Sequence, residues 1–260
     1  MEDSKIEWTD HTFNPWIGCE KVSDGCLHCY AEQMSKRYGW AEWGPNGKRK
    51  KTSEANWRKP LSWNRKAEKE GRRYKVFCGS LCDVFEDNEQ TIWWLVELFE
   101  LIEQTPNLDW LLLTKRPENI YDMWPRIPTR WDPRFEEYNE PHKTLSNVWL
   151  GTTVENEELL GKRLDTLFTS PADKYFVSVE PMLSRIWLGD WLTIIDWVIC
   201  GGESGPGCRP FNVEWARRLL KECRAEGVPF FMKQLGGYPD KRDKLSDFPE
   251  DLRVREFPDD

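Results

Sequence analysis

The sequence predicts an α/β protein, a partial or complete (β/α) barrel with mostly parallel strands. Three observations lead to this prediction. The chain has 260 residues, a length that suits an α/β barrel as a single domain. Short, almost purely apolar runs recur along it, as in strands that are buried on both faces of a parallel sheet. Amphipathic stretches separate these runs and predict helices. A flat, doubly wound sheet is the alternative fold.

Seven runs rich in Val, Ile, Leu, Phe and Trp are expected to be strands: Thr12–Ile17, Tyr74–Leu81, Trp110–Thr114, Val148–Thr153, Tyr175–Val179, Trp197–Gly201 and Pro229–Lys233. Helices are expected at Thr91–Glu103, Glu157–Phe168 and Val213–Glu226, where apolar residues recur every three or four positions. Gly227 fits the position that follows the end of a helix. Strands that alternate with helices are joined by right-handed crossovers, so the strands should run parallel.

We expect one barrel domain over residues 1–235, with two interruptions. Residues 36–73 are basic and contain tryptophans, which is typical of an insertion. Residues 122–146 carry four prolines and are expected to be a long loop or lid. Residues 236–260 are expected to form a charged C-terminal tail.

The composition narrows the class of protein. No apolar run approaches the roughly 18 residues of a membrane-spanning helix, and the acidic start lacks the apolar centre of a secretory signal. We therefore expect a cytoplasmic protein with no membrane partner, whose eight cysteines are reduced and free to bind metal. The net charge of −8 argues against a protein that is coated in nucleic acid, although residues 36–75 hold 14 Lys and Arg against 4 acidic residues.

Three cysteines near the start of the chain, Cys19, Cys26 and Cys29, are the strongest candidates for metal ligands. A structural zinc site or an ordinary ferredoxin cluster takes four protein ligands. Three thiolates can hold a [4Fe–4S] cluster by three corners and leave the fourth iron open to a cofactor. Two alternatives stay open: a zinc site with His28 or His11 as its fourth ligand, and cysteines that are simply buried.

The run Cys26-Leu27-His28-Cys29 resembles the cysteine motif of the radical SAM superfamily, with His28 in the place of its usual aromatic residue. The six residues between Cys19 and Cys26 depart from the common, shorter gap. The chain is also similar, over nearly its full length, to the phage Gp37/Gp68 family of uncharacterised proteins. The segments that carry this similarity are Trp8–Cys19, Leu112–Pro117, Ser178–Leu183 and Gly201–Gly205.

The superfamily resemblance implies a [4Fe–4S] cluster at the three cysteines, S-adenosylmethionine as the second cofactor, hydrogen abstraction from a substrate, and a flavodoxin- or ferredoxin-like electron donor. Two segments, Gly79–Asp83 and Thr114–Pro117, resemble parts of spore photoproduct lyase, a radical SAM enzyme of DNA repair. By that analogy Ser80 and Asp83 meet the methionyl ammonium group, and Lys115 meets its carboxylate. The alternative is that these residues cap strand ends or form surface ion pairs.

Polar residues after later strands are further candidates for cofactor contacts. Thr153 and Glu155 are expected near the ribose hydroxyls, and Glu180, inside an apolar strand, needs a partner. Gly201 and Gly202 permit a close approach between backbone and ligand, although a plain connecting loop would have the same composition. No catalytic residue is predicted. The other cysteines are expected to be buried packing residues: Cys78, Cys82, Cys200, Cys208 and Cys223.

The basic segment suggests a nucleic acid as partner or substrate. Its Lys and Arg residues alternate with Trp40, Trp43, Trp57 and Trp63, and such segments pair with phosphates and stack on bases. A solvated helix with its tryptophans turned inward has the same composition. Taken with this segment, the superfamily resemblance implies a radical SAM enzyme that acts on a nucleic acid or nucleotide. The alternative is a zinc-stabilised phage protein that binds DNA or accompanies a nuclease, without redox chemistry.

Overall fold

The computed structural model describes residues 4, 6–125 and 142–258, and the fold is stated for these residues. Seven strands form one sheet in the order β1-β4-β5-β6-β7-β8-β9, and each neighbouring pair is parallel. These strands are β1 (His11–Phe13), β4 (Tyr74–Cys78), β5 (Leu108–Thr114), β6 (Val148–Thr153), β7 (Lys174–Val179), β8 (Trp197–Gly201) and β9 (Phe230–Gln234). The predicted α/β fold with parallel strands is confirmed.

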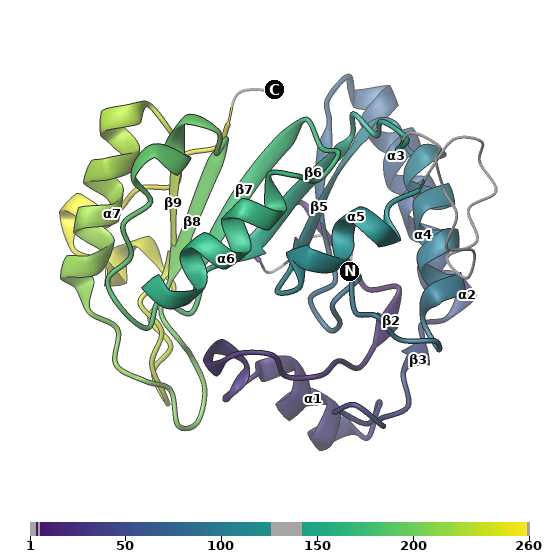
Figure 1. Cartoon of the computed structure of the whole chain (residues 1–260), viewed down its shortest axis with the longest axis horizontal. Helices are drawn as coiled ribbons and strands as arrows, with labels where there is room; N and C mark the ends of the chain where they lie inside the picture. Colours follow the sequence, from purple (N-terminus) through teal and green to yellow (C-terminus); the bar gives the residue numbers. More distant parts are fainter. Residues whose placement is uncertain (1–3, 5, 126–141, 259–260) are drawn as a thin grey trace.

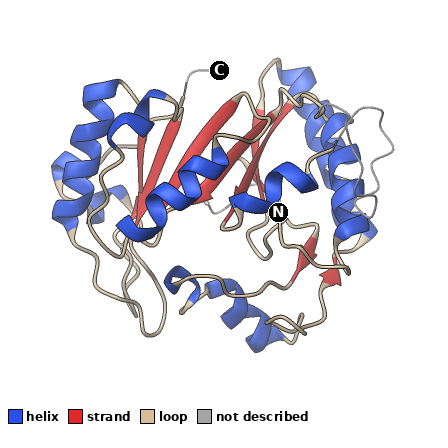
Figure 2. Cartoon of the chain, viewed as in Figure 1, coloured by secondary structure: helices blue, strands red, loops and turns tan. Residues whose placement is uncertain are grey.

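The strand order distinguishes the two folds that the sequence allowed. Strands are added in chain order without a reversal, whereas a doubly wound sheet reverses its order part-way. Right-handed crossovers then place all the connecting helices on one face. In the described chain β1 and β9 are the outermost strands and do not pair with each other, so the barrel is partial. Figures 1 and 2 show the fanned strands with helices along the outside.

The helices follow the strands along the chain. They are α1 (Tyr30–Tyr38), α2 (Glu54–Trp57), α3 (Lys59–Glu70), α4 (Ile92–Glu103), α5 (Ile120–Met123), α6 (Glu157–Leu167) and α7 (Val213–Glu226). The predicted ends of α6 and α7 have a local cause. Asn156 and Asn212 cap their first turns through their side chains, and Gly227 ends α7 with a φ of 72°, a conformation that favours glycine.

The two faces of the sheet are buried in different clusters. On β4, Val76 and Cys78 pack with the helices, while Phe77 between them points to the other face. The same alternation on the other strands, together with Trp8 before β1, builds an inner-face cluster of Trp8, Phe77, Leu111, Trp149, Phe176, Trp197, Ile199 and Phe231. This inner-face cluster contains no residue of a described helix. Burial on both faces explains why the strands read as unbroken apolar runs.

The first predicted strand is divided in two. Within Thr12–Ile17 the chain forms β1 and then β2 (Trp16–Ile17), which pairs antiparallel with β3 (Lys50–Lys51) in a separate small sheet. Pro15 lies between the two pieces and has no N–H group to continue the ladder. The second predicted strand ends early, at Cys78, because Gly79 turns the chain with a φ of 91°.

Three other segments had a predicted role. Residues 36–73 hold the end of α1, β3, α2 and α3, and Trp63 and Ala67 of α3 pack in the core beneath β4 and β5. Most of the predicted loop or lid at 122–146 lies outside the described residues. The end of the chain runs beside β9, where Met232 N donates to Val254 O at 2.9 Å. None of the described helices is long and apolar enough to cross a membrane.

Candidate active site

A cavity of about 420 Å³ lies at the carboxyl ends of the parallel strands. Trp8, Phe77 and Leu113 of the inner face contribute its apolar wall. Polar residues that follow β4, β5, β7 and β8 line the rest, and the loop that leads into α1 lies opposite them. Ligands bind at this edge in barrels and in other parallel α/β folds, and the volume is within the range of small-molecule sites.

All three N-terminal cysteines line this cavity. Cys26 ends a single 3-10 turn (Asp24–Cys26), and Cys29 is the residue before α1. We call residues 19–29 the cysteine loop. As placed, no three His, Cys, Asp or Glu side chains of the described residues form a group that could hold a metal ion. The structure therefore brings the three thiols to one cavity without converging them on one point.

Glu155, just after β6, binds the cysteine loop through Ser23. Its side chain is fully buried, and its carboxylate accepts hydrogen bonds from Ser23 Oγ at 2.6 Å and Arg163 Nη1 at 2.8 Å. Gly25 passes so close that a Cβ on it would lie 2.4 Å from Glu155 Oε1. The contact of Glu155 with a ribose stays a prediction, and the carboxylate that would make it already has protein partners.

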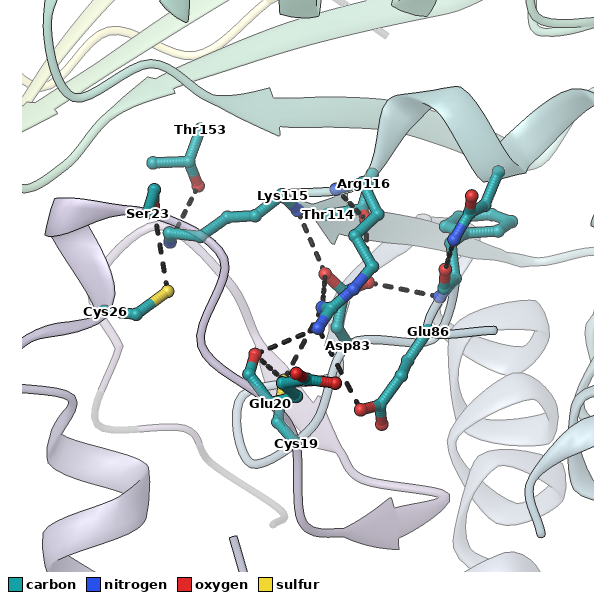
Figure 3. A network of polar contacts seen from close by, with 12 residues as sticks. Cys19, Glu20, Ser23, Cys26, Asp83, Glu86, Thr114, Lys115, Arg116 and Thr153 are labelled. Carbon is teal, nitrogen blue, oxygen red and sulfur yellow. Dashed lines mark hydrogen bonds and ion pairs between the residues drawn. The ribbon is translucent and has the colours of Figure 1, made fainter. Parts of the chain in front are cut away.

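Arg116 joins the cysteine loop to the ends of β4 and β5 (Figure 3). Its Nη1 lies 3.7 Å from Cys19 Sγ and donates to Asp83 Oδ2 at 3.0 Å, and its Nη2 donates to Glu20 O at 2.9 Å. Asp83 also accepts from Thr114 Oγ1 at 2.7 Å and from the backbone N–H of the next residue, Lys115, at 3.0 Å. The contact of Asp83 with an ammonium group stays a prediction, and its carboxylate already has these protein partners.

Burial disfavours the thiolate forms of Cys19 and Cys29 in this state. Burial raises the pKa of the Cys19 thiol to about 12, Asp83 adds to the rise, and Arg116 opposes it. Burial also raises the pKa of the Cys29 thiol, against the backbone N–H groups of Glu32 and Ala31 at the start of α1. A metal ion reverses this preference, because it binds the thiolate and displaces the proton.

A second fastening joins the cysteine loop to the loop after β8. Glu203 Oε2 is 3.1 Å from His28 Nδ1, and Arg209 binds both oxygens of Glu203 at 2.7 and 3.0 Å. Arg209 Nη2 also donates to Asp24 O at 2.9 Å. Burial alone would raise the pKa of Glu203, but the hydrogen bonds from Arg209 and His28 outweigh it and lower the pKa to about 2. Glu203 is therefore a carboxylate at neutral pH.

Two lysines present amines to the cavity. Lys115 Nζ donates to Thr153 Oγ1 at 3.3 Å and lies 3.9 Å from Glu155 Oε1, which leaves part of its donor capacity for a ligand. Glu180 lies directly after β7 and not inside the strand, as had been expected, and it is only partly buried. Its carboxylate still has the expected partner, since Lys233 Nζ donates to Glu180 Oε1 at 2.5 Å.

The predicted site residues mostly share this cavity. Its lining contains His28, Ser80, Asp83, Lys115, Thr153, Glu180 and Gly202, but not Glu155 or Gly201. Ser80 is held by Asn14, whose Nδ2 donates to its Oγ at 2.9 Å, and the Ser80 carbonyl accepts from Tyr30 Oη at 2.7 Å. Gly202 is required by packing, since a Cβ there would lie 2.4 Å from Leu235 O. The roles given to these residues as cofactor ligands stay predictions.

Over residues 3–254 the chain matches a family described as a protein of unknown function, DUF5131. The chain belongs to this family. No curated protein matches it. Among solved structures, a cysteine-to-serine mutant of spore photoproduct lyase is similar with a TM-score of 0.48 and 12% sequence identity, over 94% of this chain and 70% of that one. That likeness is too distant to support a conclusion on activity. The phage origin of the family stays a prediction.

Several residues at the site of this DUF5131 protein were missed from its sequence. Arg116 directly follows the predicted Lys115, and a strand end followed by two cations was a usable signal. Glu203 lies in the segment Gly201–Gly205, of which only Gly201 and Gly202 were named as candidates, and Arg209 follows that segment. Cys82 was assigned to packing, and it does belong to the core, yet it also lines the cavity. The same assignment is wrong for Cys208, which is only partly buried and belongs to neither core cluster. Tyr30 gave no signal, because its hydroxyl acts across 50 residues of sequence.

Proposed function

We propose that this protein is a radical SAM enzyme that holds a [4Fe–4S] cluster at Cys19, Cys26 and Cys29 and binds S-adenosylmethionine beside it. One observation carries the proposal: three thiols and the amine of Lys115 face a single cavity at the carboxyl edge of a partial parallel barrel. Thiolates are the protein ligands of iron–sulfur clusters. The three cysteines suit a cluster in the type of their donor atoms and in lining one cavity. The cysteine loop must still bring its three sulfurs together to bind the cluster.

The bound cofactors would supply one-electron chemistry that starts with removal of a hydrogen atom from the substrate. The residues of the chain would bind and orient. Lys115 would donate to the carboxylate of the cofactor, and Ser80 and Thr153 would accept or donate at its polar groups. Trp8 and Phe77 would exclude water from the reacting centre. A flavodoxin- or ferredoxin-like protein is the expected source of electrons.

A nucleic acid or nucleotide is the proposed substrate class. The support is an exposed row of cations on and beside α3: Arg58, Lys59, Arg65, Lys66, Lys69 and Arg72. Trp63 is buried in the core and cannot stack on bases, whereas Trp40 stacks on the exposed Tyr38 with ring centroids 5.0 Å apart, and Trp43 lines the cavity. Charge would therefore supply most of the affinity, and the binding should weaken steeply with salt.

A charge-reversal pair tests this substrate class. The double variant Arg65→Glu with Lys66→Glu should weaken binding to a single-stranded DNA oligonucleotide. The slope of the logarithm of the binding constant against the logarithm of salt concentration should become shallower by the contribution of about two phosphate contacts. The matched control is Lys221→Glu with Arg224→Glu on the exposed face of α7. Equal binding by both double variants and the unchanged protein would remove the α3 face from the proposal.

Anaerobic reconstitution tests the enzyme class. The protein should take up iron and sulfide, absorb broadly in the visible range, and form 5′-deoxyadenosine when given dithionite and S-adenosylmethionine. Replacing Cys19, Cys26 or Cys29 with alanine should abolish both signals, while Cys208→Ala, outside the cavity, should keep them. Cys82, a fourth thiol on the same cavity, favours a zinc-stabilised DNA-binding protein as the second candidate. Colourless protein with one tightly bound zinc would support that candidate instead.

A further inference from the structure

Four polar residues line the part of the cavity that lies at the ends of β7 and β9. They are Ser178, Glu180, Lys233 and Gln234, and we call them the β7–β9 group. Between these two strands lies β8, which ends at Gly201 and has no side chain there. A Cβ on Gly201 would lie 3.3 Å from Glu180 Oε1 and 3.4 Å from Gln234 Cγ. The bare backbone of Gly201 thus lets side chains of β7 and β9 come together across β8.

An irregularity in the sheet brings two consecutive residues of β9 to the cavity. Neighbouring residues of a regular strand point to opposite faces, yet Lys233 and Gln234 both line the cavity. The register of β9 against β8 shifts between Cys200 and Gly201. Such bulges change the direction of a side chain and are frequent next to active sites. The shift therefore adds a polar residue to the cavity that regular pairing would have turned away.

Ser178 has a buried hydroxyl that the protein does not use. It lies two residues after Phe176 of the inner-face cluster and therefore points to the same face of β7. Ser178 is 2% exposed and lines the cavity, and its hydroxyl makes no hydrogen bond to any residue that the structure describes. Buried polar side chains nearly always have a partner. A hydroxyl without one at the wall of a cavity indicates that a ligand atom belongs there.

The other three members of the β7–β9 group also keep capacity for hydrogen bonds. Lys233 Nζ uses one of its three N–H groups on Glu180 Oε1 at 2.5 Å. The second carboxylate oxygen of Glu180 has no partner within the described ranges of the chain. Gln234 donates from its side-chain amide to Gly202 O at 2.7 Å, and its carbonyl oxygen accepts nothing from the described residues. The group thus offers donors and acceptors side by side.

The charge of the cavity differs between its two ends. Near β5 and β6, Lys115 and Arg163 face one carboxylate, that of Glu155, which leaves one positive charge. In the β7–β9 group the ammonium group of Lys233 cancels the carboxylate of Glu180. An anionic group is therefore attracted to the first end. The second end suits an uncharged polar group that both donates and accepts hydrogen bonds, and a few such contacts are what orient a ligand in its pocket.

We propose that the β7–β9 group binds the edge of a nucleobase that carries a ring N–H beside a C=O, as uracil, thymine and guanine do. Glu180 accepts from the N–H, Lys233 donates to the C=O, and Ser178 contacts a further polar atom of the base. Trp8 and Phe77 offer an apolar wall to the flat ring. The inference rests on the proposed function, whose substrate class it narrows, and on this assignment Glu180 contacts the substrate rather than the cofactor.

A pair of nucleosides tests the proposal by isothermal titration calorimetry of the full chain. Uridine and cytidine have the same sugar and almost the same shape. Cytidine has an acceptor in place of the ring N–H of uridine and an amino group in place of its carbonyl oxygen, so it would leave Glu180 and Lys233 without partners. Because a two-point contact with a base edge discriminates strongly against the wrong base, we expect uridine to bind about tenfold more tightly than cytidine.

Two variants separate binding from a purely structural role. Ser178→Ala removes a hydroxyl that has no partner among the described residues, so a thermal melt should show no loss of stability, while uridine binding weakens several-fold. Glu180→Gln with Lys233→Met removes both charges together, leaves no charge alone, and should abolish the preference for uridine. Ser170→Ala is the matched control, because its hydroxyl is likewise buried without a partner in the described chain but lies outside the cavity.

Each outcome decides for or against the β7–β9 group. Equal affinities of the unchanged protein for uridine and cytidine, or no binding of either, would overturn the inference. Uridine binding that weakens as much in Ser170→Ala as in Ser178→Ala would also overturn it. The Ser178→Ala result stands alone where the double variant folds poorly. These titrations need neither a cluster nor S-adenosylmethionine. Failed anaerobic reconstitution would therefore overturn the proposed enzyme class without changing them, and failed titrations would leave that class standing.

Discussion

Replacing Gly25 with alanine should loosen the cysteine loop. The new Cβ would lie 2.4 Å from Glu155 Oε1 and 2.5 Å from Glu155 Cγ. Glu155 cannot retreat, because it is fully buried and bound by Arg163. Since non-bonded carbon atoms prefer separations of about 3.5–4.0 Å, the loop must move outward by about 1 Å. That movement breaks the 2.6 Å hydrogen bond from Ser23 to Glu155.

The size of the effect follows from the bond that is lost. A hydrogen bond to a charged group contributes about 1.5–3 kcal/mol. Alanine also restricts the unfolded chain more than glycine does, which stabilises the folded state by about 0.4–1 kcal/mol. The net loss of free energy at the loop is therefore about 1–2 kcal/mol. Because about 1.4 kcal/mol is a factor of ten, opening of the loop should become roughly tenfold more frequent.

Hydrogen exchange of the amides of Cys26 and Leu27 measures this opening, since they donate to the carbonyls of Ser23 and Asp24 in the 3-10 turn. We expect roughly tenfold faster exchange in Gly25→Ala. Gly161→Ala in α6 is the control, because its Cβ meets only Asp165 Oδ2 at 3.8 Å and alanine favours the helix. Exchange in Gly25→Ala as slow as in the unchanged protein would refute the reasoning.

Two further predictions concern stability. Because Arg209 and His28 lower the pKa of Glu203 to about 2 from an ordinary 4.5, its contribution is present above about pH 5 and is lost as the pH falls towards 2. Urea unfolding should therefore show Glu203→Gln least stable relative to the unchanged protein near neutral pH, with the difference shrinking in acid. A difference that does not change with pH would contradict this. Gly151→Ala should lower the free energy of unfolding by about 1–3 kcal/mol through overpacking, because its Cβ would lie 2.4–2.6 Å from the ring of Phe176. Phe176→Leu in the same chain should restore part of the loss in a thermal melt, and an additive pair would argue against the clash.

The strands were predictable because both faces of the sheet are buried. Val148–Thr153 and Trp197–Gly201 read as continuous apolar runs, and the structure has strands with those bounds. The helix α3 was not separated from its basic surroundings, because only Pro60, Trp63 and Ala67 of its 12 residues are buried. Its exposed cations hide the helical period. Two-residue strands such as β2 and β3 depend on pairing across the chain and leave no local pattern.

The location of the candidate site could be predicted from the sequence, but most of its side-chain contacts could not. Residues at the ends of parallel strands must meet at one edge, so Ser80, Lys115 and Glu180 were found together. The side-chain directions depend on partners far away in sequence. Glu155 turns to Ser23, 132 residues earlier, and Arg116 turns to Cys19, 97 residues earlier. Such contacts depend on how the complete sheet packs, so local sequence patterns do not predict them.

The residues that bind the cysteine loop are synthesised well after the loop itself. The loop leaves the ribosome early, but the residues that hold it come late: Arg116 follows Cys19 by 97 residues, and Glu203 follows His28 by 175. The last anchor, Arg209, follows Asp24 by 185 residues, so at about 5–20 residues per second it emerges roughly 9–37 s after the loop. During that interval the thiols belong to an unanchored chain, open to stray metal ions and oxidants. The anchored form of the cysteine loop is therefore reached only once the sheet is complete.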